Sequence, residues 1–283
     1  MPKSQDPESY IDILCNYPAI DNHAHPLLTA SNRNRLAFEG LTSEAEGPAL
    51  DDAVYTLAHS TARRDLARLY GLPLHASWEE IKKHRSARPY DDLCRLCFEK
   101  AKIQCVLIDD GITSLKGIAE EYRWHDRYTS SPTRRIVRVE TVAEVCPRTS
   151  CNPRCANPLK YVQDILKEFF EMGIFGSNPG IDELRRFAGI LHARLKASAD
   201  DPNVAGFKSV ACYRTGLNVA VDPNVPAEIE ALRSTYGQFR LQANVPIRLE
   251  QKALNDSIVR MTLEVAAEHN KPGITCFFGS CLA

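Results

Sequence analysis

The chain is predicted to be an α/β protein with a parallel sheet covered by helices. Short apolar runs rich in β-branched residues alternate with longer segments of helical periodicity, an order typical of parallel strands joined by helical crossovers. No internal repeat, low-complexity tract or Gly/Ser linker divides the 283 residues, so we expect a single domain over residues 1–283. In α/β folds of this kind, functional residues gather where the strands end.

The first third of the chain is expected to hold one strand and a helical insertion. A helix at residues 8–16 precedes a strand at residues 19–23. A mainly helical insertion follows over residues 27–102, in which Ser77 and Glu80 have the Ser-x-x-Glu spacing of a capping box. The insertion therefore separates the first strand from the next one.

The remaining elements follow the insertion. Apolar runs predict strands at residues 104–109, 135–140 and 204–212, and apolar residues at three- and four-residue spacing predict helices at residues 159–169, 181–191 and 248–269. Polar or charged residues stand at the end of each strand. We therefore expect a site at the carboxyl ends of the strands.

The charge balance argues against several classes of partner. The 35 Lys and Arg residues nearly offset the 36 Asp and Glu residues, and no basic block is present, so nothing favours nucleic acid or an anionic membrane surface. No segment approaches the roughly 20 apolar residues that cross a bilayer, and the N-terminus lacks the pattern of a secretion signal. We expect a cytoplasmic protein that acts on a small polar molecule.

The ten cysteines are interpreted as free thiols, because a large chain without a secretion signal does not need a disulfide framework. Two groupings have metal-like spacing, namely Cys94 with Cys97 and the trio Cys146, Cys151 and Cys155. Neither supplies by itself the four ligands of a structural zinc site. The first pair also fits one half-buried helix face, which we prefer to a zinc ribbon.

The most informative motif is YPAIDNHAHPLL, at residues 17–28. Side chains at i and i+2 of a strand share a face, so Asp21, His23 and His25 should point the same way. Two imidazoles aimed together form a natural clamp for a divalent ion such as zinc. The alternative is that they are polar residues at a strand end, bonded to their neighbours, and spacing alone does not decide between the two.

Four segments, IDNHAHPLL, VLIDDG, RIVRVE and GFKSVACYRTGL, spread over residues 20–217, resemble the metal-dependent amidohydrolases. More narrowly, they are similar to the amidohydrolase-like N-terminal domain of fungal FluG-type and plant nodulin/glutamine-synthetase-like fusion proteins. The resemblance implies a (βα)8 barrel with a zinc or manganese site at the carboxyl ends of its strands. It also implies attack by metal-bound water on a C–N or related bond of a small substrate.

The same resemblance implies roles for single residues. His23 and His25 match the first-strand metal ligands. Lys208 lies on the fourth strand, where many relatives carry a lysine that bridges two metal ions as a carbamate and would serve catalysis. A charge beside the substrate, or a lysine that extends along the strand to solvent, are the alternatives for Lys208.

Other polar residues at strand ends are weaker candidates. Arg214, after the fourth strand, has the planar fork that binds a substrate carboxylate, although a surface or helix-capping arginine is equally consistent. Glu140 and Asp21 are expected to support the site by orienting a ligand or a water molecule. Asp109 and Asp110 end the second strand, where a turn or a helix N-cap explains them as well.

The remaining histidines have no ligand-type spacing and are interpreted mostly as surface residues; they are His59, His75, His84, His125, His192 and His269. His125 is the exception, because a position after the second strand would lie on the catalytic face of a barrel. A packed or solvent-facing loop histidine is the preferred interpretation even there.

The end of the chain departs from the family pattern. After Pro272 the sequence reads GITCFFGSCLA and then ends, whereas the family continues to later strands with another ligand histidine and the general-base aspartate. We therefore expect a truncated barrel of about four to five strands, with little hydrolase activity of its own and an exposed sheet edge that favours homo-oligomers. A non-catalytic scaffold, or γ-glutamyl ligase chemistry borrowed from a glutamine-synthetase-like partner domain, are the alternative functions.

Overall fold

The computed structural model describes residues 7–112, 115–140, 179–241 and 249–275. These residues fall into two compact units, an N-terminal unit, Met1–Arg134, and a C-terminal unit, Arg135–Phe278. Each unit contains parallel strands and helices. The α/β class is therefore confirmed, whereas the single domain stays a prediction.

The N-terminal unit is built on two parallel strands, β1 (Ala19–Ala24) and β2 (Ile103–Ile108). Helix α1 (Pro7–Asn16) precedes β1 and ends against Lys102, whose Nζ donates to the carbonyl oxygen of Cys15 at 2.7 Å. The backbone of Lys102 has a positive φ of 53°, and its carbonyl oxygen accepts a hydrogen bond from the amide of Ala19 at 2.9 Å. Both predicted strands are confirmed to within a residue.

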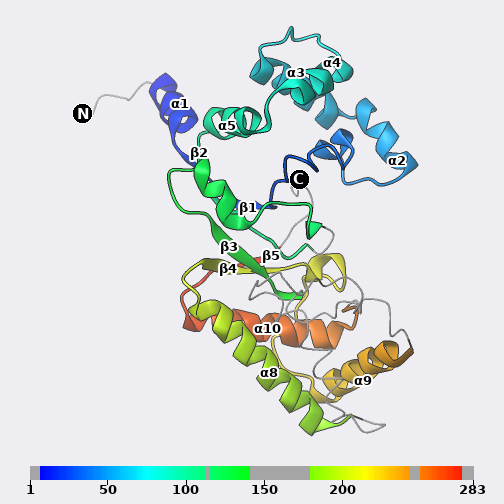
Figure 1. Ribbon diagram of the computed structural model, residues 1–283. Helices are drawn as coiled ribbons and strands as arrows, with labels where there is room; N and C mark the ends of the chain where they lie inside the picture. The colour runs from blue at the N-terminus through cyan, green and yellow to red at the C-terminus, as the bar shows by residue number, and fades with distance from the viewer. Residues whose placement is uncertain (1–6, 113–114, 141–178, 242–248, 276–283) are drawn as a thin grey trace, which may run out of the picture. The chain divides into compact units, whose positions relative to one another are not determined.

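Helices fill the segment between β1 and β2, and Figure 1 shows α3, α4 and α5 gathered beside one another. Their order is η1 (Phe38–Leu41), α2 (Pro48–Asp51), η2 (Asp52–Tyr55), α3 (Leu57–Tyr70), α4 (Trp78–Ala87) and α5 (Tyr90–Lys100). The capping box is confirmed, because the Ser77 amide donates to Glu80 Oε2 at 2.7 Å and Ser77 Oγ accepts from the Glu80 amide. After β2 comes a short helix, η4 (Tyr122–Arg127).

Histidine burial departs from the sequence interpretation at His59. Its side chain is buried, and its ring centroid lies 4.3 Å from that of Trp78. Imidazole is a flat ring that packs like an aromatic residue, and His59 lies on the face of α3 turned towards α4. The surface interpretation was therefore wrong for this residue, whereas His75 and His192 are exposed as expected.

The described part of the C-terminal unit carries three parallel strands, β3 (Arg134–Arg138), β4 (Val204–Ser209) and β5 (Gly273–Thr275). A Cβ atom on Gly206 would lie 2.5 Å from the carbonyl oxygen of Pro272. Only glycine permits this approach, which lets the amide of Phe207 donate to the same oxygen at 3.0 Å. Strand β4 ends at Ser209, three residues before the predicted end, because Ala211–Tyr213 forms a 3-10 turn, η6.

Three helices among the residues that the structure describes enclose the core of this unit: α8 (Ile181–Asp200), α9 (Val225–Leu241) and α10 (Lys252–Glu268). The core itself is formed by aliphatic and aromatic side chains from these helices and from β3 and β4, among them Leu191, Leu195, Phe207, Leu232 and Ile258. Two of the three helices were predicted, and α9 was not. The helix predicted at residues 159–169 lies outside the described residues.

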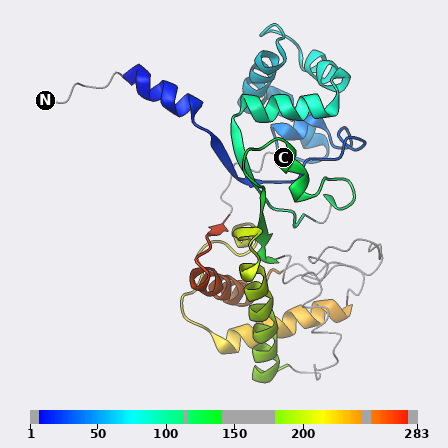
Figure 2. The ribbon, with the colours of Figure 1, turned by 60° about the vertical axis from the view of Figure 1, so that its left-hand side comes forward.

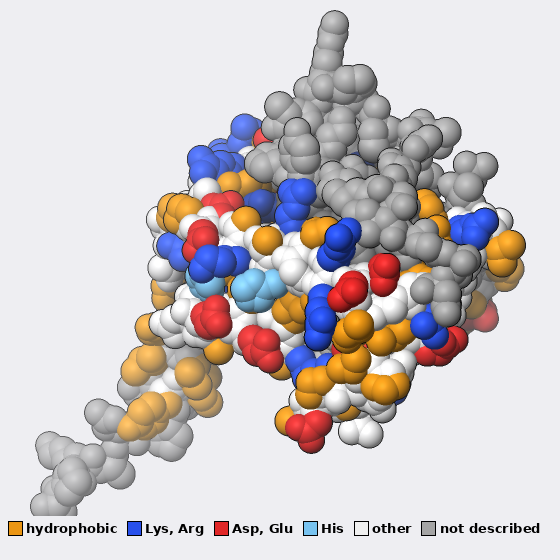
Figure 3. All heavy atoms as spheres, turned by 90° about the horizontal axis from the view of Figure 1, so that it is seen from below, with side chains coloured by type: hydrophobic (Ala, Val, Ile, Leu, Met, Phe, Trp, Pro, Cys, Tyr) orange, Lys and Arg blue, Asp and Glu red, His pale blue; other side chains and the backbone are white. Residues whose placement is uncertain are grey.

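Helix α1 exposes apolar side chains to solvent. It stands clear of the other helices of its unit in Figure 2, and Tyr10, Ile11, Ile13 and Leu14 are each more than half exposed. On the face shown in Figure 3, acidic, basic and apolar side chains are intermixed, and neither sign of charge dominates.

Among the described helices, none combines the length and the apolar character that crossing a bilayer would require.

Candidate metal centre

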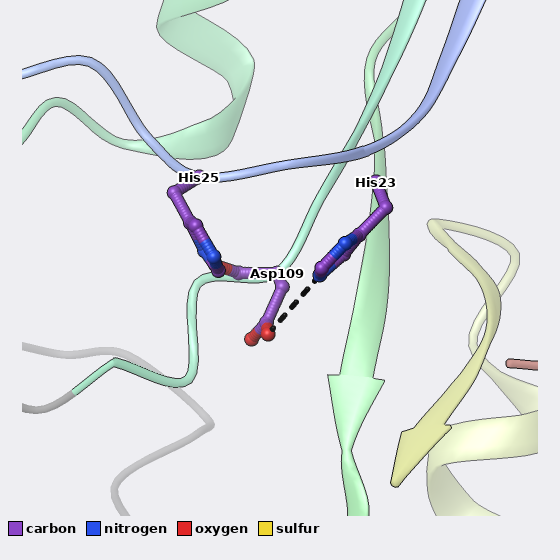
Figure 4. A group of neighbouring side chains, drawn as sticks. All are labelled: His23, His25 and Asp109. Carbon is purple, nitrogen blue, oxygen red and sulfur yellow. Dashed lines mark hydrogen bonds and ion pairs between the residues drawn. The ribbon is translucent and has the colours of Figure 1, made fainter. Parts of the chain in front are cut away.

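His23 and His25 lie side by side at the carboxyl end of β1. Their ring centroids are 5.3 Å apart, and the ring planes are inclined by 76°. The register between β1 and β2 is irregular from Asp21 to Ala24, so the chain bends where the two histidines leave the strand. Figure 4 shows both rings turned towards the loop that follows β2.

Asp109, the first residue after β2, joins the two histidines. Its amide donates to the carbonyl oxygen of Ala24 at 2.9 Å, which extends the β1–β2 pairing to the site. The side chain is fully buried, with Oδ1 accepting from the amide of Gly111 at 3.0 Å and Oδ2 lying 3.7 Å from His23 Nε2. One ligand atom from each of His23, His25 and Asp109 lies within 4.8 Å of the other two.

The backbone of Asp109 also determines the tautomer of His25. Nδ1 of His25 lies 3.1 Å from the Asp109 carbonyl oxygen, and a carbonyl oxygen only accepts hydrogen bonds. Nδ1 therefore carries the proton, and Nε2 carries the lone pair that can bind a metal ion. A metal-ligating histidine usually donates its other nitrogen in this way.

The distance between the His23 ring and the Asp109 carboxylate suits two ligands of one ion better than a direct hydrogen bond between them. At 3.7 Å, His23 Nε2 and Asp109 Oδ2 are beyond the range of a hydrogen bond. Two ligands about 2.1 Å from a tetrahedral ion are roughly 3.4 Å apart. Two imidazoles and one carboxylate are also the donor set of several catalytic zinc sites. The residues present therefore fit a divalent ion, with solvent or substrate completing its coordination.

Asp21 contacts the backbone of the motif. Its Oδ1 accepts a hydrogen bond from the amide of His23 at 3.2 Å. Asp21 thus holds the main chain of the first ligand, and an action on a histidine ring or a water molecule stays a prediction.

Lys208, Glu140 and Arg214 belong to the C-terminal unit. The Lys208 side chain is only 1% exposed, which rules out a lysine that extends to solvent. Glu140 is buried as well, and its Oε1 accepts from Ser209 Oγ at 2.6 Å and from the amide of Val210 at 2.8 Å. These bonds hold the turn that ends β4, directly after Lys208.

Glu140 is an unusual carboxyl group because its other oxygen, Oε2, is buried without a hydrogen-bond partner in the described part of the chain. Burial raises the pKa of Glu140, against the opposing effect of the hydrogen bonds from Ser209 and Val210 and of the Arg214 charge. Arg214 is half-buried and follows η6. Its charge acts on Glu140, while its predicted binding of a substrate carboxylate stays a prediction.

Replacing Glu140 with Gln is expected to preserve or raise stability at pH 7. The amide oxygen can still accept from Ser209 and Val210, while the cost of burying a carboxylate is removed. A raised pKa means that the parent loses stability as pH rises from the unfolded value of about 4.5 through the folded one. The free energy of unfolding of the variant, relative to that of the parent, should therefore rise by about 1 kcal/mol between pH 4 and pH 7. Urea unfolding at the two pH values measures this.

The control for Glu140 is Glu140→Ala, which leaves the Ser209 hydroxyl and the Val210 amide without their acceptor. This variant should lose roughly 2–3 kcal/mol at both pH values. If Glu140→Gln is as unstable as Glu140→Ala at pH 7, the ionised carboxylate itself holds the turn, contrary to this account.

Among the described residues, no cysteine belongs to the cluster of potential metal ligands. Cys94 is buried and Cys97 is partly buried on α5, as the helix-face interpretation requires. Burial raises the pKa of both thiols, which disfavours the thiolate that binds metal. Cys146, Cys151 and Cys155 lie outside the described residues.

Fold and site together define an α/β protein with parallel strands and a histidine–carboxylate cluster at their carboxyl ends. Comparison with known proteins adds a relative, protein fluG of Emericella nidulans, which is 34% identical over 276 residues, or 92% of this chain. The chain is therefore FluG-like. It spans 29% of the length of that relative. No protein-family model matches the sequence, and no solved structure matches it.

Asp109 is the functional candidate that sequence reasoning missed as a ligand. The signal was present, because Asp109 directly ends an apolar strand. Carboxyl ends of neighbouring parallel strands meet at one edge of a sheet, so pairing the second strand with the first would have placed Asp109 beside His23. A turn role for the same residue is also correct, since Oδ1 accepts from Gly111.

Proposed function

We propose that the chain is a metal-dependent hydrolase of amidohydrolase type, acting on a C–N, amide-like bond of a small anionic substrate. The observation that carries the proposal is the convergence of His23, His25 and the buried Asp109, with ligand atoms within 4.8 Å of one another. The FluG-like sequence and the parallel strands of both units are consistent with a (βα)8-type barrel.

His23, His25 and Asp109 would hold the ion, with zinc preferred and manganese as the alternative. When bound, such an ion supplies Lewis acidity that polarises a substrate carbonyl. The protein's own contribution is orientation. The backbone of Asp109 fixes the tautomer of His25. Gly111 fixes the Asp109 carboxylate through Oδ1, which leaves Oδ2 turned towards Nε2 of His23.

Within the C-terminal unit, Lys208 and Arg214 are the charged residues for which the family resemblance implies a functional role. A lysine as buried as Lys208 is either neutralised by a partner or modified, and the carbamate is the modification proposed. Arg214 would hold an anionic end of the substrate through its planar fork. Glu140 would keep the turn after Lys208 in place through Ser209 and Val210.

The proposal is tested by loading the 283-residue chain with zinc or manganese and measuring metal content after dialysis. A panel of small amides and N-acylated amino acids, compared with the matching neutral amides, then reports hydrolysis and the preference for an anionic end. One equivalent of metal with metal-dependent amide hydrolysis, however slow, supports the proposal. Metal without hydrolysis supports a non-catalytic module instead, and no retained metal overturns the site.

A further inference from the structure

The segment directly after the metal motif is tied to the rest of the N-terminal unit by bonds from three directions. We call residues 27–29 the anchored segment. The amide of Glu120 donates to the Leu27 carbonyl oxygen at 2.8 Å, and the amide of Thr29 donates to the carbonyl oxygen of Ile118 at 2.8 Å. An antiparallel bridge pairs Leu28 with Ala119. The hydroxyl of Tyr90, from α5, donates to the Leu28 carbonyl oxygen.

A further bond of the anchored segment comes from a buried histidine. His125, on η4, is 1% exposed, and its Nε2 accepts a hydrogen bond from the Leu27 amide at 3.1 Å. Its Nδ1 lies 2.9 Å from the carbonyl oxygen of Tyr122 and must donate to it. One neutral tautomer, protonated at Nδ1, satisfies both contacts, and burial favours the neutral ring by lowering its pKa.

Pro26 connects this histidine to the metal motif. Leu27 is two residues from His25, and the proline between them has a nearly fixed φ and restricts the backbone of the residue before it. Few freely rotating backbone torsions therefore separate the Leu27 amide from His25. On its other side, His25 is held by the Asp109 carbonyl oxygen through Nδ1.

We propose that His125 is a positioning residue for the metal site, which holds His25 in its ligating orientation through the Leu27 amide and the Pro26 backbone. His125 touches neither the ion nor the substrate in this account. The inference deepens the proposed function and rests on it, because it assigns a support to the same metal site. This role explains why His125 is buried although it is far from the ligands in sequence. Only a neutral imidazole has a ring nitrogen that can accept the hydrogen bond from the Leu27 amide.

Two substitutions at His125 distinguish the effect of its hydrogen-bond acceptor on zinc binding from the effect of its ring volume. His125→Leu fills similar space and accepts no hydrogen bond, whereas His125→Gln keeps an oxygen acceptor near the position of Nε2. Zinc affinity, measured by competition with a chromophoric chelator, should fall about tenfold or more in the Leu variant, as for other groups that orient metal ligands. The Gln variant should recover most of that loss. Tyr90→Phe, which removes another bond to the anchored segment, should cause a smaller decrease.

The matched control is His59→Leu, the same substitution at another buried histidine of the N-terminal unit. His59 packs on Trp78, so its replacement should lower thermal stability without changing zinc affinity. Hydrogen exchange supplies a readout without metal, in which the Leu27 amide should be protected in the parent and in His125→Gln and exchange faster in His125→Leu. If His125→Leu is too unstable to assay, the Gln and Tyr90→Phe variants still carry the comparison.

The outcomes distinguish this inference from the proposed function. A parent chain that retains no zinc overturns the metal site, and the inference with it. A parent that binds zinc, with His125→Leu binding equally well or His59→Leu weakened to the same extent, overturns the inference alone. If the Leu variant cannot be assayed, the inference is supported when His125→Gln keeps both the zinc affinity and the Leu27 protection of the parent while Tyr90→Phe binds zinc more weakly. Loss of Leu27 protection with parent-like zinc affinity, in either variant, overturns it.

Discussion

The double variant His23→Ala/His25→Ala is expected to retain no stoichiometric zinc. Two of the three clustered ligands are then absent, and Asp109 alone does not complete a site that normally has three or four protein ligands. Loss of the His25 bond to Asp109 should cost only about 1 kcal/mol of stability, so the variant should stay folded. Metal content after dialysis, together with the circular dichroism spectrum, measures both effects.

The control for the double variant is His75→Ala/His192→Ala, which removes two exposed histidines. Both double variants lack two imidazoles. Zinc that is lost merely because fewer histidines bind it weakly at the surface is therefore lost equally from both. The control should bind one equivalent of zinc like the parent. Parent-like zinc content in the His23/His25 variant would show that the metal binds elsewhere in the chain.

Asp109→Asn is expected to weaken zinc binding by about 100-fold or more, since loss of a group that merely orients a ligand already costs 10–100-fold. The amide oxygen of Asn can still accept from the Gly111 amide as Oδ1 does, so the turn after β2 should persist. The charge that completes the histidine–carboxylate donor set is lost. Competition titration of parent and variant at pH 7 measures the difference.

Asp110→Asn is the matched control, because it makes the same change of charge one residue further along the chain. Its zinc affinity should stay within about threefold of the parent, the residual being the long-range effect of one charge in water. If the two Asn variants are weakened equally, the effect of Asp109 is electrostatic, and its carboxylate is not a ligand.

Strand positions and the two histidines were predictable because they depend on local pattern. Apolar runs ending in polar residues located β1, β2 and β3 to within about two residues, and the i, i+2 spacing placed His23 beside His25. The capping box of Ser77 and Glu80 was equally local.

Features that depend on packing between distant segments were not predictable. His59 is polar in sequence, and only the stacking on Trp78 explains its burial. Lys208 could extend to solvent or stay inside, and the structure buries it. Helix α9 contains Gly237, a weak helix former, which weakens its local pattern. Its packing on α8 and α10 supplies the missing stability.

The measurement that tests the central claim most directly is X-ray absorption spectroscopy of the zinc-loaded chain. His23, His25 and Asp109 predict a first coordination sphere of nitrogen and oxygen only, at about 2.0–2.1 Å, with the outer-shell scattering of two imidazoles. The Asp109→Asn variant should bind too weakly to give the same spectrum at equal loading. Sulfur scattering at about 2.3 Å would instead assign the ion to cysteines and contradict the site proposed for this protein.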